Sequence, residues 1–177
     1  MNPKQSRIDQ LVKHFGLIPL PFEGGLYQQT YKAEETIPVS ALPSRYHSPR
    51  SYGTAILYLL TGDPQSFSAL HRLLTDEIYH FYLGDPVEML LLYPDGCHEK
   101  VILGQDILAG QHVQFVVPAG AWQGSHLRPG GEYALIGTSM APGYEDEDFE
   151  LGQRAGLANV YPAAAELINC LTQESKG

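Results

Sequence analysis

The stretch that decides the fold is Ser66-Phe67-Ser68-Ala69-Leu70-His71-Arg72-Leu73-Leu74-Thr75-Asp76-Glu77-Ile78-Tyr79-His80-Phe81-Tyr82-Leu83-Gly84. Its aromatic and aliphatic residues predict two strands, over 67–73 and 77–83. Between His71 and His80 the same stretch also carries two carboxylates, Asp76 and Glu77. Titratable groups are costly to bury unless they are paired or functional, so this stretch is the first candidate for a site.

A second stretch has the pattern of two strands joined by a tight turn. It contains Phe115-Val116-Val117-Pro118-Ala119-Gly120-Ala121-Trp122-Gln123, in which Pro118 and Gly120 form the turn. Further strands are expected over residues 26–31, 36–42, 51–60, 87–93, 98–103, 112–117, 121–127 and 133–139. Short strands and turns at intervals of about ten residues are typical of an all-β sandwich or barrel.

The bulk composition describes an ordinary globular domain. The 177 residues are 44% hydrophobic and 18% charged, and a chain of this length can form one domain with a full core. A net charge of −9 argues against a nucleic-acid partner, because duplex binding depends on Lys and Arg at phosphates. No apolar run has the length of a membrane span, and the first residues lack the apolar segment of a signal peptide, so we expect a cytoplasmic protein. Cys97 and Cys170 have no metal-binding or redox spacing.

The two ends of the chain predict helices that flank the strands. Residues 6–15 place apolar side chains on one helical face, and residues 162–173 do the same near the C-terminus. We expect residues 141–177 to form a tail that packs on the barrel. Its acidic run, residues 145–148, has no calcium-loop spacing and is predicted to be solvated. Glu23, before a Gly-Gly pair, is expected to be a solvated loop carboxylate, with a position in a pocket as the alternative.

Two motifs resemble those of the cupin superfamily, a jelly roll also described as a double-stranded β-helix. The first cupin motif is Gly-x5-His-x-His-x3,4-Glu-x6-Gly, and His71, Glu77 and Gly84 match it, whereas Leu73 replaces the second His. The second motif is Gly-x5-Pro-x-Gly-x2-His-x3-Asn. Its Pro-x-Gly turn is present at residues 118–120, but Gln123 replaces the His, residue 127 is Leu rather than Asn, and Gly110 lies two residues too far upstream.

The chain is more closely similar to the fifth cupin family, a domain of unknown function. The matching stretches are Glu23-Gly24-Gly25-Leu26-Tyr27, Ser51-Tyr52-Gly53-Thr54-Ala55-Ile56, Asp76-Glu77-Ile78-Tyr79-His80-Phe81-Tyr82, Val117-Pro118-Ala119-Gly120-Ala121-Trp122-Gln123-Gly124 and Ala141-Pro142-Gly143-Tyr144. This resemblance implies an RmlC-like jelly roll, a single cupin domain over residues 1–177 with a barrel core of about 26–140, and a homodimer. It implies no established reaction.

The usual cupin metal site, with three His and one Glu, is incomplete in this sequence. Leu73 cannot coordinate a metal, and the carbonyl of Gln123 is a weak neutral ligand. His71 and Glu77 remain, whereas catalytic sites generally keep three protein ligands. We therefore predict no cofactor. If a divalent metal does bind, its predicted ligands are His71, Glu77 and His80.

Strand alternation decides which of these side chains face the interior. If Glu77 faces inward, a regular strand also turns Tyr79 inward and His80 outward, and Gln123 inward implies His126 outward. A bulge near Glu77 would reverse this for His80.

Acid–base chemistry is the metal-free alternative. His71 would act as the base, Glu77 would orient it, and Tyr79 or Tyr82 would act as the acid, as in sugar epimerases with a similar fold. Trp122 is either a stacking wall for a ring or a core residue.

Three functional hypotheses follow and stay open at this point. The first is a sugar isomerase-like or epimerase-like enzyme acting on a small polar or carbohydrate-like molecule, the second a non-catalytic, storage-like binding protein, and the third a metal-dependent cupin with shifted ligands. The residues predicted to contact a ligand are His71, Glu77, His80, Gln123, Trp122 and Tyr82.

Overall fold

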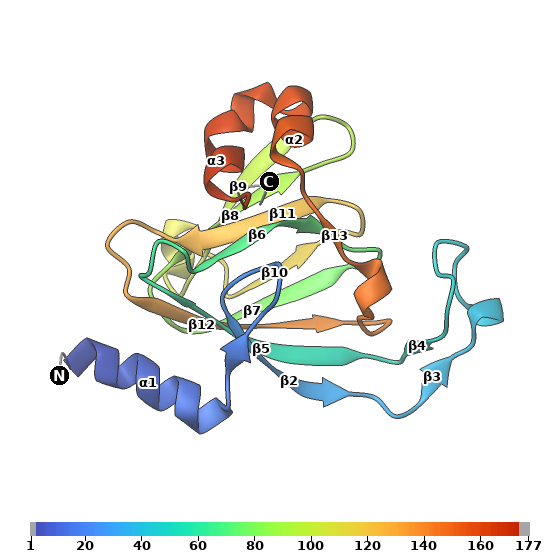
Figure 1. Ribbon diagram of the computed structural model, residues 1–177, viewed down its shortest axis with the longest axis horizontal. Helices are drawn as coiled ribbons and strands as arrows, with labels where there is room; N and C mark the ends of the chain where they lie inside the picture. The colour runs from blue at the N-terminus through green and yellow to red at the C-terminus, as the bar shows by residue number, and fades with distance from the viewer. Residues whose placement is uncertain (1–2, 174–177) are drawn as a thin grey trace.

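The computed structural model describes residues 3–173, and two packed antiparallel sheets form its centre (Figure 1). The six-stranded sheet has the order β1 (Ile18–Pro19), β2 (Leu26–Lys32), β5 (Thr54–Thr61), β12 (Tyr133–Met140), β7 (Glu77–Gly84) and β10 (Gln114–Val117). The five-stranded sheet has the order β13 (Glu150–Leu151), β6 (Phe67–Arg72), β11 (Trp122–Leu127), β8 (Val87–Leu92) and β9 (His98–Leu103). This is the predicted all-β jelly roll, and the strand predictions over 67–73, 77–83 and 98–103 are confirmed to within a residue or two.

Alternation along β7 follows the predicted parity. Glu77, Tyr79 and Phe81 are buried, whereas His80 is half-buried and Tyr82 is exposed. A strand with period two presents one apolar face to the opposite sheet, and β7 has this pattern apart from its first inward residue. The inward carboxylate of Glu77 is therefore the exception in an apolar row.

The interior is packed with hydrocarbon at one end and hollow at the other. Along β5, Tyr58 and Leu60 belong to the apolar core between the sheets, whereas Thr54 and Ile56 line a cavity. Along β12, Ala134 and Ile136 are core, whereas Thr138 and Met140 line the same cavity. The remaining buried members of this core are Tyr79, Phe81, Val87, Met89, Leu91, Val101, Leu103, Val117, Ala121 and Leu127.

Helices cover the outer faces of both sheets (Figure 1). Helix α1 (Pro3–Phe15) packs its apolar stripe on Leu59 and Leu135 of the six-stranded sheet. It ends where predicted and begins three residues earlier than the expected 6–15. The predicted C-terminal helix is a 3-10 turn (Pro162–Ala164) followed by α3 (Ala165–Cys170), and an additional helix, α2 (Arg154–Val160), lies beside it. Together they cover Leu70 and Leu90 of the five-stranded sheet.

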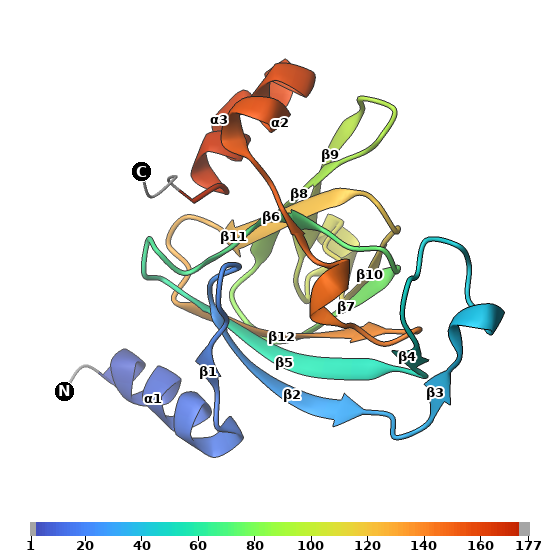
Figure 2. The same cartoon turned by 45° about the vertical axis from the view of Figure 1, so that its right-hand side comes forward.

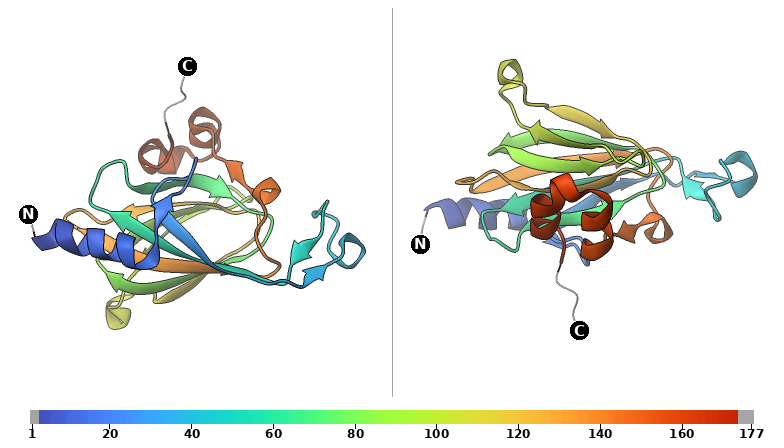
Figure 3. Two further views of the ribbon diagram at one scale, coloured as in Figure 1. Left: turned by 60° about the horizontal axis from the view of Figure 1, so that its bottom comes forward. Right: turned by 90° about the horizontal axis from the view of Figure 1, so that it is seen from above.

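A small hairpin projects from the sandwich (Figure 3). It pairs β3 (Thr36–Ile37) with β4 (Arg50–Ser51). The predicted strand over 36–42 is therefore much shorter, because a 3-10 turn (Val39–Ala41) follows Pro38. Proline supplies no backbone donor for a ladder, so the strand stops before it.

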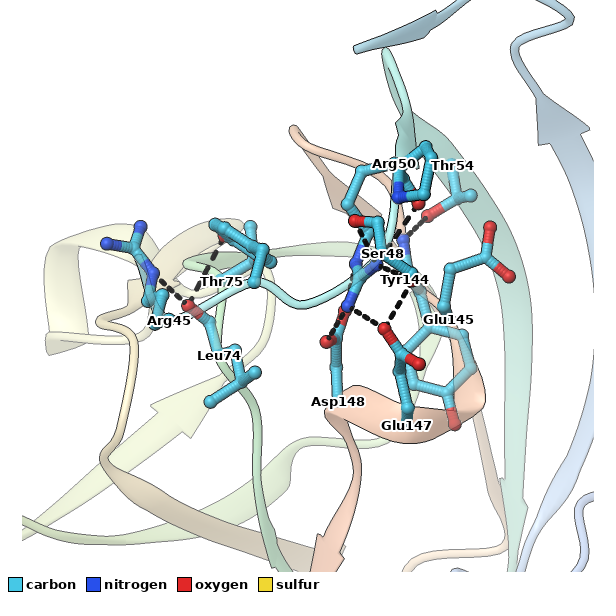
Figure 4. Close-up of polar contacts among 12 residues, drawn as sticks. Arg45, Ser48, Arg50, Thr54, Leu74, Thr75, Tyr144, Glu145, Glu147 and Asp148 are labelled. Carbon is cyan, nitrogen blue, oxygen red and sulfur yellow. Dashed lines mark hydrogen bonds and ion pairs between the residues drawn. The ribbon is translucent and has the colours of Figure 1, made fainter. Parts of the chain in front are cut away.

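The segment after β12 crosses from the six-stranded to the five-stranded sheet and ends in β13 (Figure 2). It contains a 3-10 turn (Asp146–Asp148) and a buried ion pair (Figure 4). Arg50 is 1% exposed, and its Nε and Nη2 donate to the two oxygens of Asp148 at 2.9 Å and 2.6 Å. Glu147 accepts from Arg50 Nη2 at 2.6 Å and from the hydroxyl of Ser48. We call Arg50, Asp148 and Glu147 the arginine clasp.

The arginine clasp corrects the prediction of a solvated acidic run for Asp148, whereas Asp146 and Glu147 are exposed as predicted. Asp148 is buried, because a guanidinium that the sequence places 98 residues away compensates its charge. The hydrogen bonds from Ser48 and then from Arg50 lower the pKa of Glu147 below its usual value. The clasp thereby fixes the crossing segment against the β3–β4 hairpin.

Replacing Arg50 by Ala is expected to lower the free energy of unfolding by about 3 kcal/mol, because Asp148 would stay buried without a counter-charge. The matched control is Lys32→Ala, since Lys32 pairs with Glu145 of the same acidic run at 2.7 Å but on the surface. This control is expected to change the stability by less than about 1 kcal/mol. Urea titrations of both variants measure the difference, and equal losses would show that burial does not strengthen the clasp.

Candidate active site

The hollow end of the sandwich is a cavity of about 630 Å³. Strands of both sheets, the loop before β2 and the crossing segment contribute to its wall. The lining residues are Leu20, Pro21, Phe22, Glu23, Tyr27, Gln29, Lys32, Thr54, Ala55, Ile56, His71, Leu73, Glu77, Thr138, Met140, Tyr144, Glu145, Asp146 and Phe149. This volume is in the range of pockets that hold small molecules.

Three buried polar side chains meet at this cavity; His71 and Glu77 line it, and Gln123 contacts both from behind. His71 on β6 and Gln123 on β11 are paired across the five-stranded sheet, and Glu77 comes from β7 of the other sheet. The side-chain amide Nε2 of Gln123 donates to Glu77 Oε2 at 2.6 Å and contacts His71 Nε2 at 3.3 Å. The structure thus brings together the three residues that stand at cupin motif positions.

The hydrogen bonds of His71 define its protonation state in this arrangement. Its Nδ1 lies 2.8 Å from the carbonyl oxygen of Ala69, which can only accept, so Nδ1 carries a proton. Its Nε2 faces the amide NH2 of Gln123, which can only donate, so Nε2 carries a lone pair. His71 is therefore a neutral imidazole whose free nitrogen lies at the inner end of the cavity.

Glu23 is the fourth member of this group, and the expectation of a solvated loop carboxylate is wrong. Its Oε1 accepts a hydrogen bond from the hydroxyl of Ser68 at 2.7 Å, and its backbone carbonyl accepts from the amide of Ala69 at 2.7 Å. The next residue, Gly24, has a φ of 99°, and a Cβ there would collide with the carbonyl oxygen of Phe67. Only glycine allows this close approach, so the Gly-Gly pair was the sequence signal for a pocket position.

Glu23 and Tyr79 both have raised pKa values. Burial is the main cause of the raised pKa of Glu23, and the charge of Glu77 adds to it. Hydrogen bonds with Ser68 and Tyr58 oppose it, and His71 would oppose it only when it carries a positive charge. Burial, followed by the charge of Glu77, raises the pKa of Tyr79 well above its usual value. Both groups therefore hold their protons more strongly than they would in water.

Phe149 is a site residue whose role sequence reasoning missed. Its ring stacks on the imidazole of His71, with centroids 5.2 Å apart and planes 22° from parallel. The arginine clasp and β13 hold the segment that carries it, and β13 pairs Leu151 with His71. No spacing pattern links Phe149 to His71, because the contact depends on the crossing segment.

His80 does not join this group, which corrects the predicted metal triad of His71, Glu77 and His80. It lies on the outer face of β7, where its Nε2 is 3.1 Å from the hydroxyl of Ser139. Pairing of β7 with β12 is regular from Glu77 to Phe81, so no bulge turns His80 inward; the irregularity lies beyond Phe81. Tyr82 is exposed on the same outer face, with its ring 6.4 Å from that of His80.

Trp122 is placed away from the cavity, and Tyr79 lies behind its wall. Trp122 packs with the C-terminal helices on the outer face of the five-stranded sheet, under the guanidinium of Arg72 at 4.7 Å. Arg72 in turn pairs with Glu150 at 2.7 Å, so it is an outward salt bridge. Tyr79 is buried in the apolar core between the sheets and is not a lining residue, but it lies close enough to Glu77 for the charge of Glu77 and a hydrogen bond to add to the effect of burial in raising its pKa. The acid predicted at Tyr79 or Tyr82 thus has no place on the cavity wall.

The donor set does not fit the usual cupin metal. Leu73 lines the cavity where a His ligand stands in the motif, and it has no donor atom. Gln123 directs N–H groups, which cannot coordinate a metal, at both His71 and Glu77. Within residues 3–173, no group of three or more His, Cys, Asp or Glu side chains is arranged to hold a metal ion.

Restoring the motif is expected to create a metal site. The double variant Leu73→His with Gln123→His would place three His and Glu77 around one point and remove the competing amide. We expect one tightly bound Mn²⁺ or Zn²⁺ per chain after dialysis, measured by elemental analysis. The control is Gln123→His alone, which still lacks a ligand at Leu73 and is expected to retain less than the double variant. Equal metal content in the double variant and the unaltered chain would contradict this explanation.

Replacing Glu23 by Gln is expected to stabilise the fold at neutral pH and to have no effect at acid pH. Because the pKa of Glu23 is higher in the folded chain, its carboxyl group ionises at a lower pH in the unfolded chain than in the folded chain. The free energy of unfolding therefore falls as the pH rises from the unfolded pKa to the folded pKa. Glutamine mimics the protonated form at all pH values. Urea titrations at pH 4 and pH 8 measure the difference, and a variant that is destabilised at pH 8 would contradict the raised pKa.

Comparisons with known proteins agree with the fold and the motifs. A curated relative, the uncharacterized protein YML079W of Saccharomyces cerevisiae, is 31% identical over 151 residues, which cover 81% of this chain and 74% of that protein. A solved protein of Shewanella oneidensis is 30% identical with a TM-score of 0.80, and a hypothetical protein from Leishmania major is 26% identical with a TM-score of 0.82. Each alignment covers 94% of this chain and 98% of the other.

More distant structures share the fold alone. A dTDP sugar isomerase from Desulfovibrio desulfuricans is 18% identical, with a TM-score of 0.52 over 86% of this chain and 99% of that chain. The family model of the cupin superfamily described as Cupin_5 (DUF985) matches residues 9–152. This range includes Glu23, His71, Glu77, Gln123 and the arginine clasp. The chain therefore belongs to the Cupin_5 (DUF985) family of the cupin superfamily.

Proposed function

We propose that the cavity binds a small polar, carbohydrate-like molecule and moves a proton on it, in the manner of an isomerase or epimerase. One observation carries this proposal. His71, whose Nε2 has one long contact at 3.3 Å, and Glu23, whose carboxyl group has a raised pKa, line the same cavity. Titratable groups whose environments favour opposite protonation states are the usual acid–base assignment.

His71 suits the role of the base. The hydrogen bond from Nδ1 to the carbonyl of Ala69 fixes the tautomer, and Phe149 holds the ring plane from one side. The contact between Nε2 and the amide of Gln123 is 3.3 Å, a long hydrogen bond that a ligand can displace. A proton taken up at Nε2 would place a positive charge close to Glu77, whose Oε2 shares the same amide donor.

Glu23 replaces Tyr79 and Tyr82 as the acid. Its raised pKa favours a protonated carboxyl group, and its position on the loop before β2 puts it on the cavity wall. Base and acid are thus two separate groups on the cavity wall, so that one can remove a proton and the other can supply one. The fold shared with a dTDP sugar isomerase is consistent with this chemistry and does not establish it.

A non-catalytic binding protein is the second candidate. It is favoured by the amide of Gln123, which already satisfies both His71 and Glu77 without a ligand. Such a satisfied network would shape a binding site without exposing a reactive group. Within residues 3–173, no helix has the length and apolar character to cross a membrane. The homodimer and the cytoplasmic location stay predictions.

The two candidates differ in exchange of carbon-bound protons with solvent. We expect a bound reducing sugar, incubated with the protein in D2O, to incorporate deuterium next to its carbonyl carbon, which mass spectrometry detects. His71→Gln is expected to slow this exchange by about 100-fold, since general base catalysis contributes a factor of that order. The control is His98→Gln, because His98 lies exposed on β9, outside the cavity.

If a sugar binds but no deuterium exchange occurs, the catalytic function is excluded for that sugar and the non-catalytic binding function is supported. Exchange that is equally fast in His71→Gln would remove His71 as the base. If none of the common aldoses, ketoses and polyols bound in a thermal-shift and NMR screen, the carbohydrate-like ligand class would be overturned.

A further inference from the structure

The inner polar cluster, which we define as Glu23, Ser68, His71, Glu77 and Gln123, has used up its hydrogen-bond donors. The amide NH2 of Gln123 serves Glu77 and His71, and the Nδ1–H of His71 serves the carbonyl of Ala69. The hydroxyl of Ser68 donates to Glu23. Beside the cluster, the hydroxyl of Tyr58 donates to the carbonyl of Gly24 at 2.8 Å. When Glu23 and Glu77 are both ionised, no donor of these side chains is left for a ligand.

Acceptors, by contrast, remain. Gln123 is 1% exposed, and its Oε1 finds no hydrogen-bond partner within the described residues. His71 Nε2 has a single long contact, at 3.3 Å. Glu23 and Glu77 each offer about four lone-pair sites when ionised, more than the donors around them fill. A ligand that fits this cluster must therefore bring donors.

The charged groups on the cavity wall are mostly negative, which also favours a ligand that brings donors and positive charge. Four carboxylates line the cavity, from Glu23, Glu77, Glu145 and Asp146, and Lys32 is the one Lys or Arg among the lining residues. The ammonium of Lys32 is already paired with Glu145 at 2.7 Å near the surface. His71 is neutral in this arrangement, so no protein cation compensates the inner carboxylates.

Aromatic rings complete the wall on which such a ligand would rest. Phe22, Tyr27, Tyr144 and Phe149 all line the cavity, and Phe149 is already stacked against His71. Aromatic faces attract cations and repel anions, because the ring quadrupole places negative charge above and below the plane. Rings and carboxylates together thus favour a positively charged group.

We propose that the ligand of this cavity carries an ammonium group, which binds between Glu23 and Glu77. An ammonium has three donors and no acceptor, which complements the acceptors of the inner polar cluster. Resting on the proposed function, this names the substrate class as a small hydroxylated amine such as an amino sugar. Sugar acids and nucleotide sugars are disfavoured, because their anionic groups would meet carboxylates and no free cation.

The test compares molecules that differ only in one group. Ethanolamine, ethylene glycol and glycolate form one series, and glucosamine, glucose and glucuronate form a second. The first series is small enough to enter the cavity whatever the shape of the full ligand. Binding at pH 7 and fixed ionic strength is measured by NMR titration of the methyl groups of Ile56 and Met140, which line the cavity. We expect the amine of each series to bind about tenfold or more tightly than its neutral partner, since charge pairs in buried sites exceed that factor.

Matched variants separate the cavity from the general negative charge of the protein. Glu23→Gln is expected to remove most of the preference for the amine. Glu99→Gln removes one carboxylate from the exposed strand β9, and it is expected to leave the preference unchanged.

Equal binding of amine and neutral partner, tighter binding of the acid, or a preference that survives in Glu23→Gln would each overturn this inference. Absence of binding by every member of the small series would also overturn it. These outcomes are distinct from failure of the proposed function, because deuterium exchange into a neutral sugar by His71 would still stand. Conversely, selective binding of the amine without deuterium exchange would support the ammonium site and contradict the proposed acid–base function.

Discussion

The amide of Gln123 is the contact on which the candidate site depends. It bridges the two sheets, since Gln123 and His71 belong to the five-stranded sheet and Glu77 to the six-stranded sheet. Its two N–H groups hold a carboxylate and an imidazole that would otherwise be unpaired in a buried place, where the desolvation penalty is large. A histidine here could bind a metal together with the same partners. The glutamine instead ties them to each other through hydrogen bonds.

The interior of the sandwich has a filled half and a hollow half, and the contact made by Gln123 lies next to the hollow half. Core side chains on β5 and β12 fill one half, and the same two strands change to Thr54, Thr138 and Met140 at the other half, where the cavity lies. The arginine clasp holds the crossing segment beside the cavity and thereby places Phe149 on His71. Burial of Arg50 and Asp148 thus has a consequence for the site, because it positions a ring that no strand of the barrel supplies.

Sequence patterns predicted what depends on local periodicity and motif spacing. The inward direction of Glu77 and the outward direction of His80 follow from alternation along a single strand, and the jelly roll was implied by the cupin-like motifs. The meeting of His71 with Gln123 follows from two motifs of known register. What the patterns could not give are contacts between segments far apart in the chain. Asp148 was expected in solvent because its partner Arg50 is 98 residues away.

Glu23 and Tyr79 show that sequence patterns did not predict which residues line the cavity. Tyr79 was predicted as an acid by analogy with sugar epimerases of similar fold. It does face inward beside Glu77, but alternation gives the direction of a side chain and not its depth, and Tyr79 is a core residue that does not line the cavity. Glu23 was expected in solvent because it sits in a loop rich in Gly and Pro, yet those glycines let the loop approach β6 closely enough to bond Ser68. A loop pressed against a sheet gains a carboxylate at the inner end of the cavity. Since a second carboxylate, Glu77, already lies there, repulsion favours a proton on one of the two or a positive charge between them, and the proposed acid role and the proposed ammonium site are these two alternatives.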